Sequence, residues 1–196
     1  MTISQRSGTP TAGAGAHAED HAVAGTSARV AAGATRTRTY TWQDPLAPGP
    51  VSAAPADGLA ALQGLIADGN PPPIARTLDF TLTEVERGRA VFTVVPGEHH
   101  YNPIGSVHGG LAATLCDSAC GCAVQSTLPA GAAYTTMDLT IKMLRGITVD
   151  TGTLFCEGTI IHAGRRTALA EARLTDTAGK LYAFATSTCM IFPAGG

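Results

Sequence analysis

The sequence has few positive charges and no long uninterrupted apolar run. Only two of its 196 residues are lysine, Lys142 and Lys180, and the formal net charge is -2. The basic surface typical of nucleic-acid binding and the polybasic run typical of membrane binding are therefore both missing. The most apolar stretch, residues 111–124, is shorter than a membrane-spanning helix and contains Asp117. We expect neither a nucleic-acid partner nor a membrane partner.

The first residues also lack the apolar core of a secretory signal, and the five cysteines include no Cys-x-x-Cys pair. Small buried thiols in a reducing compartment explain such cysteines most simply, so we expect a cytoplasmic protein. The adjacent His99 and His100 would not share one face of an extended segment, and His108 has no acidic partner at helical spacing. We therefore predict no metal and no cofactor.

The composition changes near residue 50. Residues 1–50 are rich in Ala, Gly and Thr and show no apolar period, which indicates a flexible tail, whereas residues 51–196 form one domain. Apolar spacing predicts helices over residues 58–68 and 107–128. Strand-like patterns cover residues 74–85, 89–95, 134–144, 153–162, 167–174 and 181–192. This order predicts an α+β fold in which an antiparallel sheet covers the long helix.

One carboxylate, Asp117, interrupts the apolar long helix. A carboxylate in apolar surroundings is costly unless it is paired, so Asp117 is a candidate functional residue. The helix begins at His108-Gly109-Gly110, where glycines allow a ligand to approach and the unpaired N–H groups favour anionic oxygen. A developing oxyanion would suit this position, although an ordinary turn has the same sequence. Asn102, in a proline-flanked loop, is likewise open to interpretation as a turn residue.

These residues resemble the signature of a known family. The run Asn102, Gly105, His108-Gly109-Gly110, Leu115, Asp117 and Gly121 is similar to that of PaaI-like thioesterases, which are hotdog-fold acyl-CoA hydrolases. The resemblance extends over about residues 72–192. It implies a hotdog fold, an antiparallel sheet wrapped around one long central helix.

The resemblance also implies roles for individual residues. Asp117 corresponds to the catalytic acid, acting as a general base toward water or as a direct nucleophile, and we favour the base. The N–H of Gly109 corresponds to the donor to the thioester oxygen, and Asn102 to a residue that positions thioester or water. His108 is expected in a supporting role, and Thr136 (with Thr135 beside it) stands in place of a family serine. Gly110 is expected to contact the substrate, and we expect Tyr101 and Tyr134 to line the acyl pocket.

By the same resemblance, the protein is expected to hydrolyse an acyl-CoA thioester to free acid and CoA. Arg165 and Arg166, in a predicted turn, could meet the CoA phosphates, with Arg145 as a second candidate and solvated turn arginines as the alternative. A homo-oligomer is expected, a dimer or a homotetramer made of two dimers, with Asp117 from one chain facing the other chain's site residues. Two alternatives are a non-catalytic acyl-CoA-binding hotdog protein and an enoyl-thioester hydratase. The acyl group is not predicted.

Overall fold

The computed structural model describes residues 34–45 and 57–192. Most of the predicted tail, residues 1–33 and 46–50, lies outside the described residues, and residues 34–45 contain no helix or strand. The second range contains, in order, α1 (Gly58–Asp68), α2 (Pro73–Leu78), β1 (Phe80–Glu86), β2 (Arg89–Val94), η1 (Glu98–His100), α3 (Gly109–Gln125), β3 (Ala133–Met143), η2 (Val149–Thr151), β4 (Leu154–Ala163), β5 (Thr167–Asp176) and β6 (Leu181–Phe192).

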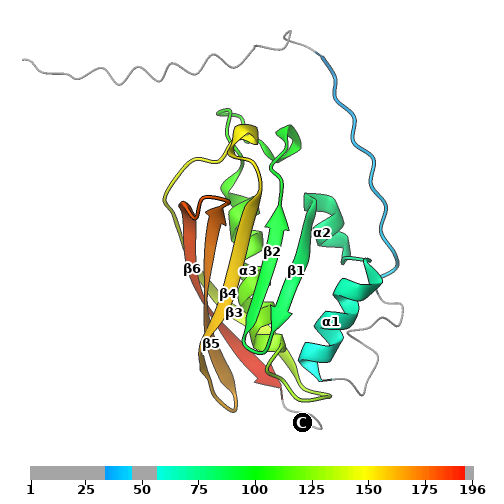
Figure 1. Ribbon diagram of the computed structural model, residues 1–196, viewed down its shortest axis with the longest axis vertical. Coiled ribbons are helices and arrows are strands. Elements are labelled where there is room, and N and C mark those ends of the chain that lie inside the picture. The colour runs from blue at the N-terminus through cyan, green and yellow to red at the C-terminus, as the bar shows by residue number, and fades with distance from the viewer. Residues whose placement is uncertain (1–33, 46–56, 193–196) are drawn as a thin grey trace, which may run out of the picture. The chain divides into compact units, whose positions relative to one another are not determined.

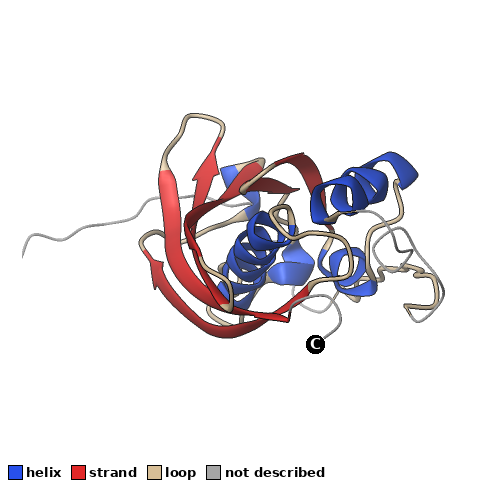
Figure 2. Cartoon of the chain, turned by 90° about the horizontal axis from the view of Figure 1, so that it is seen from below, coloured by secondary structure: helices blue, strands red, loops and turns tan. Residues whose placement is uncertain are grey.

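The six strands form one sheet around the long helix α3. The strand order is β1-β2-β4-β5-β6-β3, and every neighbouring pair is antiparallel. Figure 1 shows the strands side by side in front of and around α3, and the view along the molecule in Figure 2 shows the sheet curling about that helix. The predicted α+β class, with an antiparallel sheet wrapped around one central helix, is confirmed.

Small inward-facing residues allow α3 to lie close to the sheet. On β5 and β6 the fully buried positions include Ala168, Ala170, Ala172, Ala183 and Ala185. On β4, a Cβ added at Gly158 would lie 2.3 Å from the backbone carbonyl atoms of Ala119 in α3, so the helix backbone rests directly on this strand. Larger side chains such as Leu115, Leu154 and Leu174 are fully buried in the space that remains. Each such leucine contributes about 1.5–3 kcal/mol of burial free energy.

The prediction of a strand over residues 74–85 is correct only in its second half. Residues 73–78 form α2 instead, and β1 begins at Phe80. Pro73 is the first residue of α2, a position where its fixed φ favours a helix and its missing N–H is not needed. The helix ends at Asp79, which has a left-handed conformation with φ of 57°. The apolar residues of this segment suit either structure, and the proline decides between them.

The other predicted elements are found close to their expected positions. Asp57 is the N-cap of α1, and its side chain accepts a hydrogen bond from the Ala60 N–H at 2.9 Å; Gly69 is the C-cap and has a left-handed conformation. The long helix is shorter than its predicted range of residues 107–128, because Ser126 ends it and its hydroxyl donates to the Ala123 carbonyl. Among the residues that the structure describes, no helix combines the length and apolar character needed to cross a membrane.

Candidate active site

Asp117 lies on the one partly exposed stripe of α3. The opposite face of the helix is fully buried, whereas Asp117 is half-buried together with Thr114 and Ser118. Its Oδ1 accepts a hydrogen bond of 2.9 Å from the hydroxyl of Thr136 on β3. The carboxylate is thus held by a neutral donor, and no cation forms a salt bridge with it among the ion pairs of the described residues. Such an acid keeps a second oxygen available for water or substrate.

A β-bulge explains how Thr136 reaches the acid. The register of β3 against β6 shifts between Thr136 and Asp138, so that Met137 is an extra residue without its own partner. As a result the half-buried positions of β3 change from even to odd numbers: Tyr134 and Thr136, then Leu139 and Ile141. Strict alternation would have placed Thr136 on the opposite face from Leu139. Bulges often redirect a side chain in this way.

Asp117 borders an apolar cavity of about 510 Å³. We call it the Asp117 cavity; Ser118 and Thr136 are its other polar residues near the acid. It lies between the edge strands β1 and β3 and is closed by α1 and α2, which Figure 2 shows beside the open side of the curled sheet. Its apolar wall includes Leu65, Ile66, Ile74, Phe80, Phe92 and Tyr134. A cavity of this size and character suits a small organic group.

The start of α3 forms a second polar site. His108 is the N-cap, and its Nδ1 accepts a hydrogen bond of 2.8 Å from the Gly110 N–H, while its carbonyl accepts from the Leu111 N–H at 3.0 Å. No described residue accepts from the Gly109 N–H. His108 therefore has the structural helix-start role, and Gly109 offers the available donor of the first turn. The Gly110 N–H, expected to contact substrate, is already engaged.

Asn102 organises the loop before this helix. Its Oδ1 accepts from the N–H groups of Ile104 and Ser106 at 3.1 and 3.2 Å, and its Nδ2 donates to the Ser106 hydroxyl at 3.1 Å. The turn interpretation of Asn102 is therefore correct for its oxygen. An amide nitrogen carries two N–H bonds, so one donor of Asn102 is not used by Ser106. Turn formation and ligand contact are compatible at this residue.

Asn102, His108 and Gly109 line a cavity of about 350 Å³, which we call the Gly109 cavity. Its opposite wall includes Met143, Arg145 and Tyr182. A Cβ added at Gly109 would lie 2.5 Å from the Met143 sulfur, so only glycine fits beside this side chain in its present position. Arg145 also donates to the Leu181 carbonyl, which holds its guanidinium at the cavity. The combination of an arginine and a helix start favours an anionic ligand.

Within one chain, the expected catalytic residues therefore fall into two groups. Asp117 and Thr136 line the Asp117 cavity, whereas Asn102, His108 and Gly109 line the Gly109 cavity. Asp117 follows Gly109 by eight positions on α3, which corresponds to about 12 Å along the axis and about 80° around it. A single small reacting group therefore cannot contact both Gly109 and Asp117 of the same chain.

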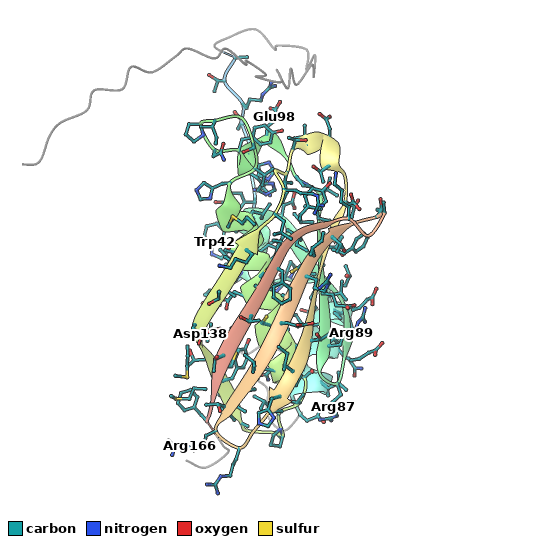
Figure 3. The ribbon with its side chains drawn as sticks, turned by 90° about the vertical axis from the view of Figure 1, so that its left-hand side faces the viewer. Trp42, Arg87, Arg89, Glu98, Asp138 and Arg166 are labelled. Carbon is teal, nitrogen blue, oxygen red and sulfur yellow. The ribbon has the colours of Figure 1, made fainter. Side chains whose placement is uncertain are left out.

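The remaining predicted substrate residues lie away from both cavities. Tyr101 lines neither cavity, and its hydroxyl accepts from the Val149 N–H at 3.0 Å. Arg165 and Arg166 are exposed in the β4–β5 turn. Figure 3 shows Arg166 at one end of the sheet and Glu98, which precedes the Asn102 loop, at the other. Within one chain these two arginines cannot serve the Gly109 cavity, whereas Arg145 borders it.

Cysteine and histidine chemistry is not favoured at these sites. All five cysteines are free, and Cys122 borders the Asp117 cavity. Burial raises the pKa of the Cys122 thiol to about 12, so it is protonated at neutral pH and a poor nucleophile. His100 is buried, with its Nδ1 accepting from the Gly97 N–H and its Nε2 facing the Leu78 carbonyl at 2.8 Å. No group of potential metal ligands is found among the described residues.

Sequence reasoning missed several residues of the two cavities. Ser118 and Cys122 border the Asp117 cavity, and Met143 and Tyr182 border the Gly109 cavity. The helical period alone would not have assigned Ser118 and Cys122 to this site, because they follow Asp117 by one and five residues and lie about 100° and 140° around α3 from it. For Met143 and Tyr182 the sequence has no signal either, since the pairing of β3 with β6 places them there.

Comparisons with known proteins relate part of the chain to one family. Residues 104–183 match the family model of the thioesterase superfamily, a range that contains α3 and strands β3 to β5. A Halobacterium salinarum protein named as a candidate esterase is 40% identical over 78 residues. That match covers 39% of this chain and 46% of the relative, so the chain spans less than half the length of this curated relative.

Solved structures show the same fold. A candidate thioesterase from Ralstonia eutropha, described as related to phenylacetic acid degradation, is 29% identical, with a TM-score of 0.58 over 64% of this chain and 96% of its own. A Streptococcus mutans protein solved with bound acetyl-CoA is 28% identical, with a TM-score of 0.53 over 59% of this chain and 90% of its own.

Proposed function

We propose that this chain, which belongs over residues 104–183 to the thioesterase superfamily and has the hotdog fold, hydrolyses acyl-CoA thioesters at a site shared by two copies. Asp117 of one copy removes a proton from water, and the resulting hydroxide adds to the thioester carbon. The oxyanion that forms accepts hydrogen bonds from the Gly109 N–H and the unused Asn102 N–H of the other copy. When the C–S bond breaks, the CoA sulfur takes the proton from Asp117, leaving the free acid and CoA.

One observation carries this proposal. The acid and its hydroxyl partner Thr136 line one cavity, while the donors suited to an oxyanion line another, about 12 Å away along the same helix. Neither half contains all the groups that water-mediated hydrolysis requires. A two-fold pair of chains brings the acid half of one copy against the donor half of the other, and it does so twice.

The edge strand β3 supports such a pairing. It has 11 residues, pairs only with β6 within the described chain, and leaves its other edge unpaired. Two large apolar side chains of this strand, Met137 and Met143, are 55% and 53% exposed. A long unpaired edge with exposed apolar residues is well suited to pair with the same strand of a second copy. We propose a dimer, alone or within a dimer of dimers.

The two cavities give the substrate its orientation. The apolar Asp117 cavity receives the acyl group, since it has room for a small organic group and the acid at its edge. The Gly109 cavity receives the thioester oxygen and the anionic carrier, with Arg145 near the carrier. Coenzyme A as the carrier is supported by the Streptococcus mutans relative with bound acetyl-CoA. Arg165 and Arg166 could contact the carrier only from a second copy.

Replacement of Asp117 by asparagine tests this function. Asp117→Asn keeps the acceptor for the Thr136 hydroxyl but removes the base, so kcat for thiol release from acyl-CoA should fall about 10²- to 10⁴-fold. A panel of acyl-CoA substrates, followed by release of free thiol, measures this rate. Asp150→Asn, at an exposed aspartate that lines neither cavity, is the matched control and should keep normal turnover.

The same assay separates the enzyme from a non-catalytic binding protein. If the unmodified chain binds acyl-CoA but releases no thiol from any member of the panel, the hydrolase proposal is wrong and a binding role replaces it. If Asp117→Asn keeps full turnover while remaining folded and oligomeric, Asp117 is not the base. Hydration of an enoyl thioester without thiol release would instead indicate a hydratase.

A further inference from the structure

Tyr134 has a half-buried ring and a hydroxyl without a hydrogen-bond partner among the described residues. It is the second residue of β3, half-buried and packed against the core. No described residue donates to or accepts from its hydroxyl. Every fully buried polar side-chain atom in the described part of the chain has a hydrogen-bond partner. The Tyr134 oxygen must therefore retain access to open space.

That space is the Asp117 cavity, because Tyr134 is part of its wall. The hydroxyl lies over Gly121 of α3, where an added Cβ would be 2.5 Å from the Tyr134 oxygen. The absence of a side chain at Gly121 thus makes room for the phenol. Any larger residue at position 121 would displace the hydroxyl.

α3 and β3 face each other at two successive levels, one at Asp117 and Thr136 and the next at Gly121 and Tyr134. Gly121 follows Asp117 by one helical turn, and Tyr134 precedes Thr136 by two residues on the same face of β3. Thr136 contacts Asp117, as Tyr134 lies over Gly121. Both spacings place the phenol oxygen about 6 Å beyond the acid along the cavity.

Chemistry also favours a ligand at this hydroxyl. A phenylalanine would fill the same space, whereas a hydroxyl in an apolar wall is unfavourable unless it has a hydrogen-bond partner. Burial raises the pKa of the Tyr134 phenol, so it stays protonated and can donate as well as accept. Cys122, the neighbouring polar side chain, is a weak hydrogen-bonding group.

We propose that Tyr134 is a specificity-determining residue, whose hydroxyl hydrogen-bonds an oxygen atom on the distal part of the acyl group. The preferred substrates would then be acyl thioesters with a hydroxyl or carbonyl oxygen several bonds from the thioester, rather than purely hydrocarbon chains. This inference rests on the proposed function for the orientation of the acyl group. It adds a preference that thioester hydrolysis by itself does not require.

The test compares three thioesters that differ by one hydroxyl: hexanoyl-CoA, 6-hydroxyhexanoyl-CoA and 2-hydroxyhexanoyl-CoA. The distal hydroxyl can reach Tyr134, whereas a hydroxyl on carbon 2 lies beside the thioester and cannot. Tyr134→Phe keeps the ring and should lower kcat/KM for the 6-hydroxy substrate about 5- to 10-fold. The values for the other two substrates should change less than about twofold. Tyr40→Phe, at a tyrosine that lines neither cavity, is the control.

Two results would overturn the inference: an equal effect of Tyr134→Phe on all three substrates, or no effect on the 6-hydroxy substrate. Binding of the thioethers S-hexyl-CoA and S-(6-hydroxyhexyl)-CoA, which cannot be hydrolysed, provides a readout independent of turnover. If Tyr134→Phe removes a binding preference for the hydroxylated thioether, the inference stands even when no thioester is cleaved. Thioester cleavage without any such preference supports the proposed function and refutes the role of Tyr134.

Discussion

Two variants that are inactive alone should regain activity in a mixed dimer if the active site is shared between chains. One variant carries Asp117→Asn and lacks the base, and the other carries Asn102→Ala and lacks an oxyanion donor. When one chain of each kind forms a dimer, one site receives both defects and the other receives none, because each site takes Asp117 from one chain and Asn102 from the other. The intact site should work as in the unmodified protein.

The expected signal is large. Loss of a general base lowers turnover about 10²- to 10⁴-fold, and loss of an oxyanion donor about 10²- to 10³-fold, so each variant alone should keep at most about 1% of normal activity. Random mixing makes half of the dimers mixed, with one intact site in each, which gives about a quarter of normal activity. Mixed dimers purified through two different tags should reach about half.

Thiol release from acyl-CoA, after co-expression or after joint refolding, measures the recovery. A mixture of Asp117→Asn with Asp117→Ala is the control, because no dimer of these chains contains an intact site. Size-exclusion chromatography should first show that Asn102→Ala keeps the oligomer, since Asn102 also holds its own loop. If the purified mixed dimer is no more active than its parents, each site lies within one chain and the proposed arrangement is wrong.

Two further substitutions test the positioning of the acid and the packing beneath it. Thr136→Val removes the hydrogen bond to Asp117 and should lower kcat about tenfold, whereas Thr136→Ser should keep most of the activity; equal losses would show that the hydroxyl is not what matters. Gly158→Ala would place a Cβ 2.3 Å from the backbone of Ala119, and should lower the free energy of unfolding by at least about 2 kcal/mol in urea denaturation. Gly146→Ala, which meets no atom within 4 Å, is its control, and equal stability of the two variants would contradict the close packing.

Much of the fold follows from local sequence patterns. The long helix, its glycine start and its interrupting carboxylate are all evident in the sequence because they depend on residues near one another in the chain. The Pro72-Pro73 pair also indicates the start of α2, whereas the apolar residues around Ile74 favour a strand. A short apolar segment suits either structure, so the proline was the better guide.

The site was harder to predict than the fold, because its parts meet through strand pairing and, in the proposed dimer, through contacts between two chains. Asp117 and Gly109 are close in sequence but line different cavities, and only the helical rise shows why. Arg165 and Arg166 formed an attractive motif, yet the structure places Arg145 beside the Gly109 cavity. Charge and composition cannot distinguish these arginines, since their positions depend on which strands are neighbours.

The bulge in β3 offers a direct test of how register controls this site. Met137 has no partner of its own, so its deletion leaves Thr136 opposite Cys189 and Asp138 opposite Thr188, as they are now. The shortened strand would alternate regularly and keep Thr136 on the side of Asp117. We therefore expect the Met137 deletion to remain folded, with a melting temperature close to normal and with measurable thiol release.

Deletion of Thr140, in the same strand, should have the opposite result. Thr140 is paired with Thr186, so its loss forces the residues on one side of it to exchange faces. Either Leu139 or Ile141 would then leave the core side of the sheet, at a cost of about 1.5–3 kcal/mol for each large apolar side chain exposed. If both deletions destabilise the protein equally in thermal unfolding, Met137 is not a surplus residue. The alternation of β3 would then need another explanation, because Thr136 and Leu139 are three residues apart and yet both are half-buried, which strict period two does not allow.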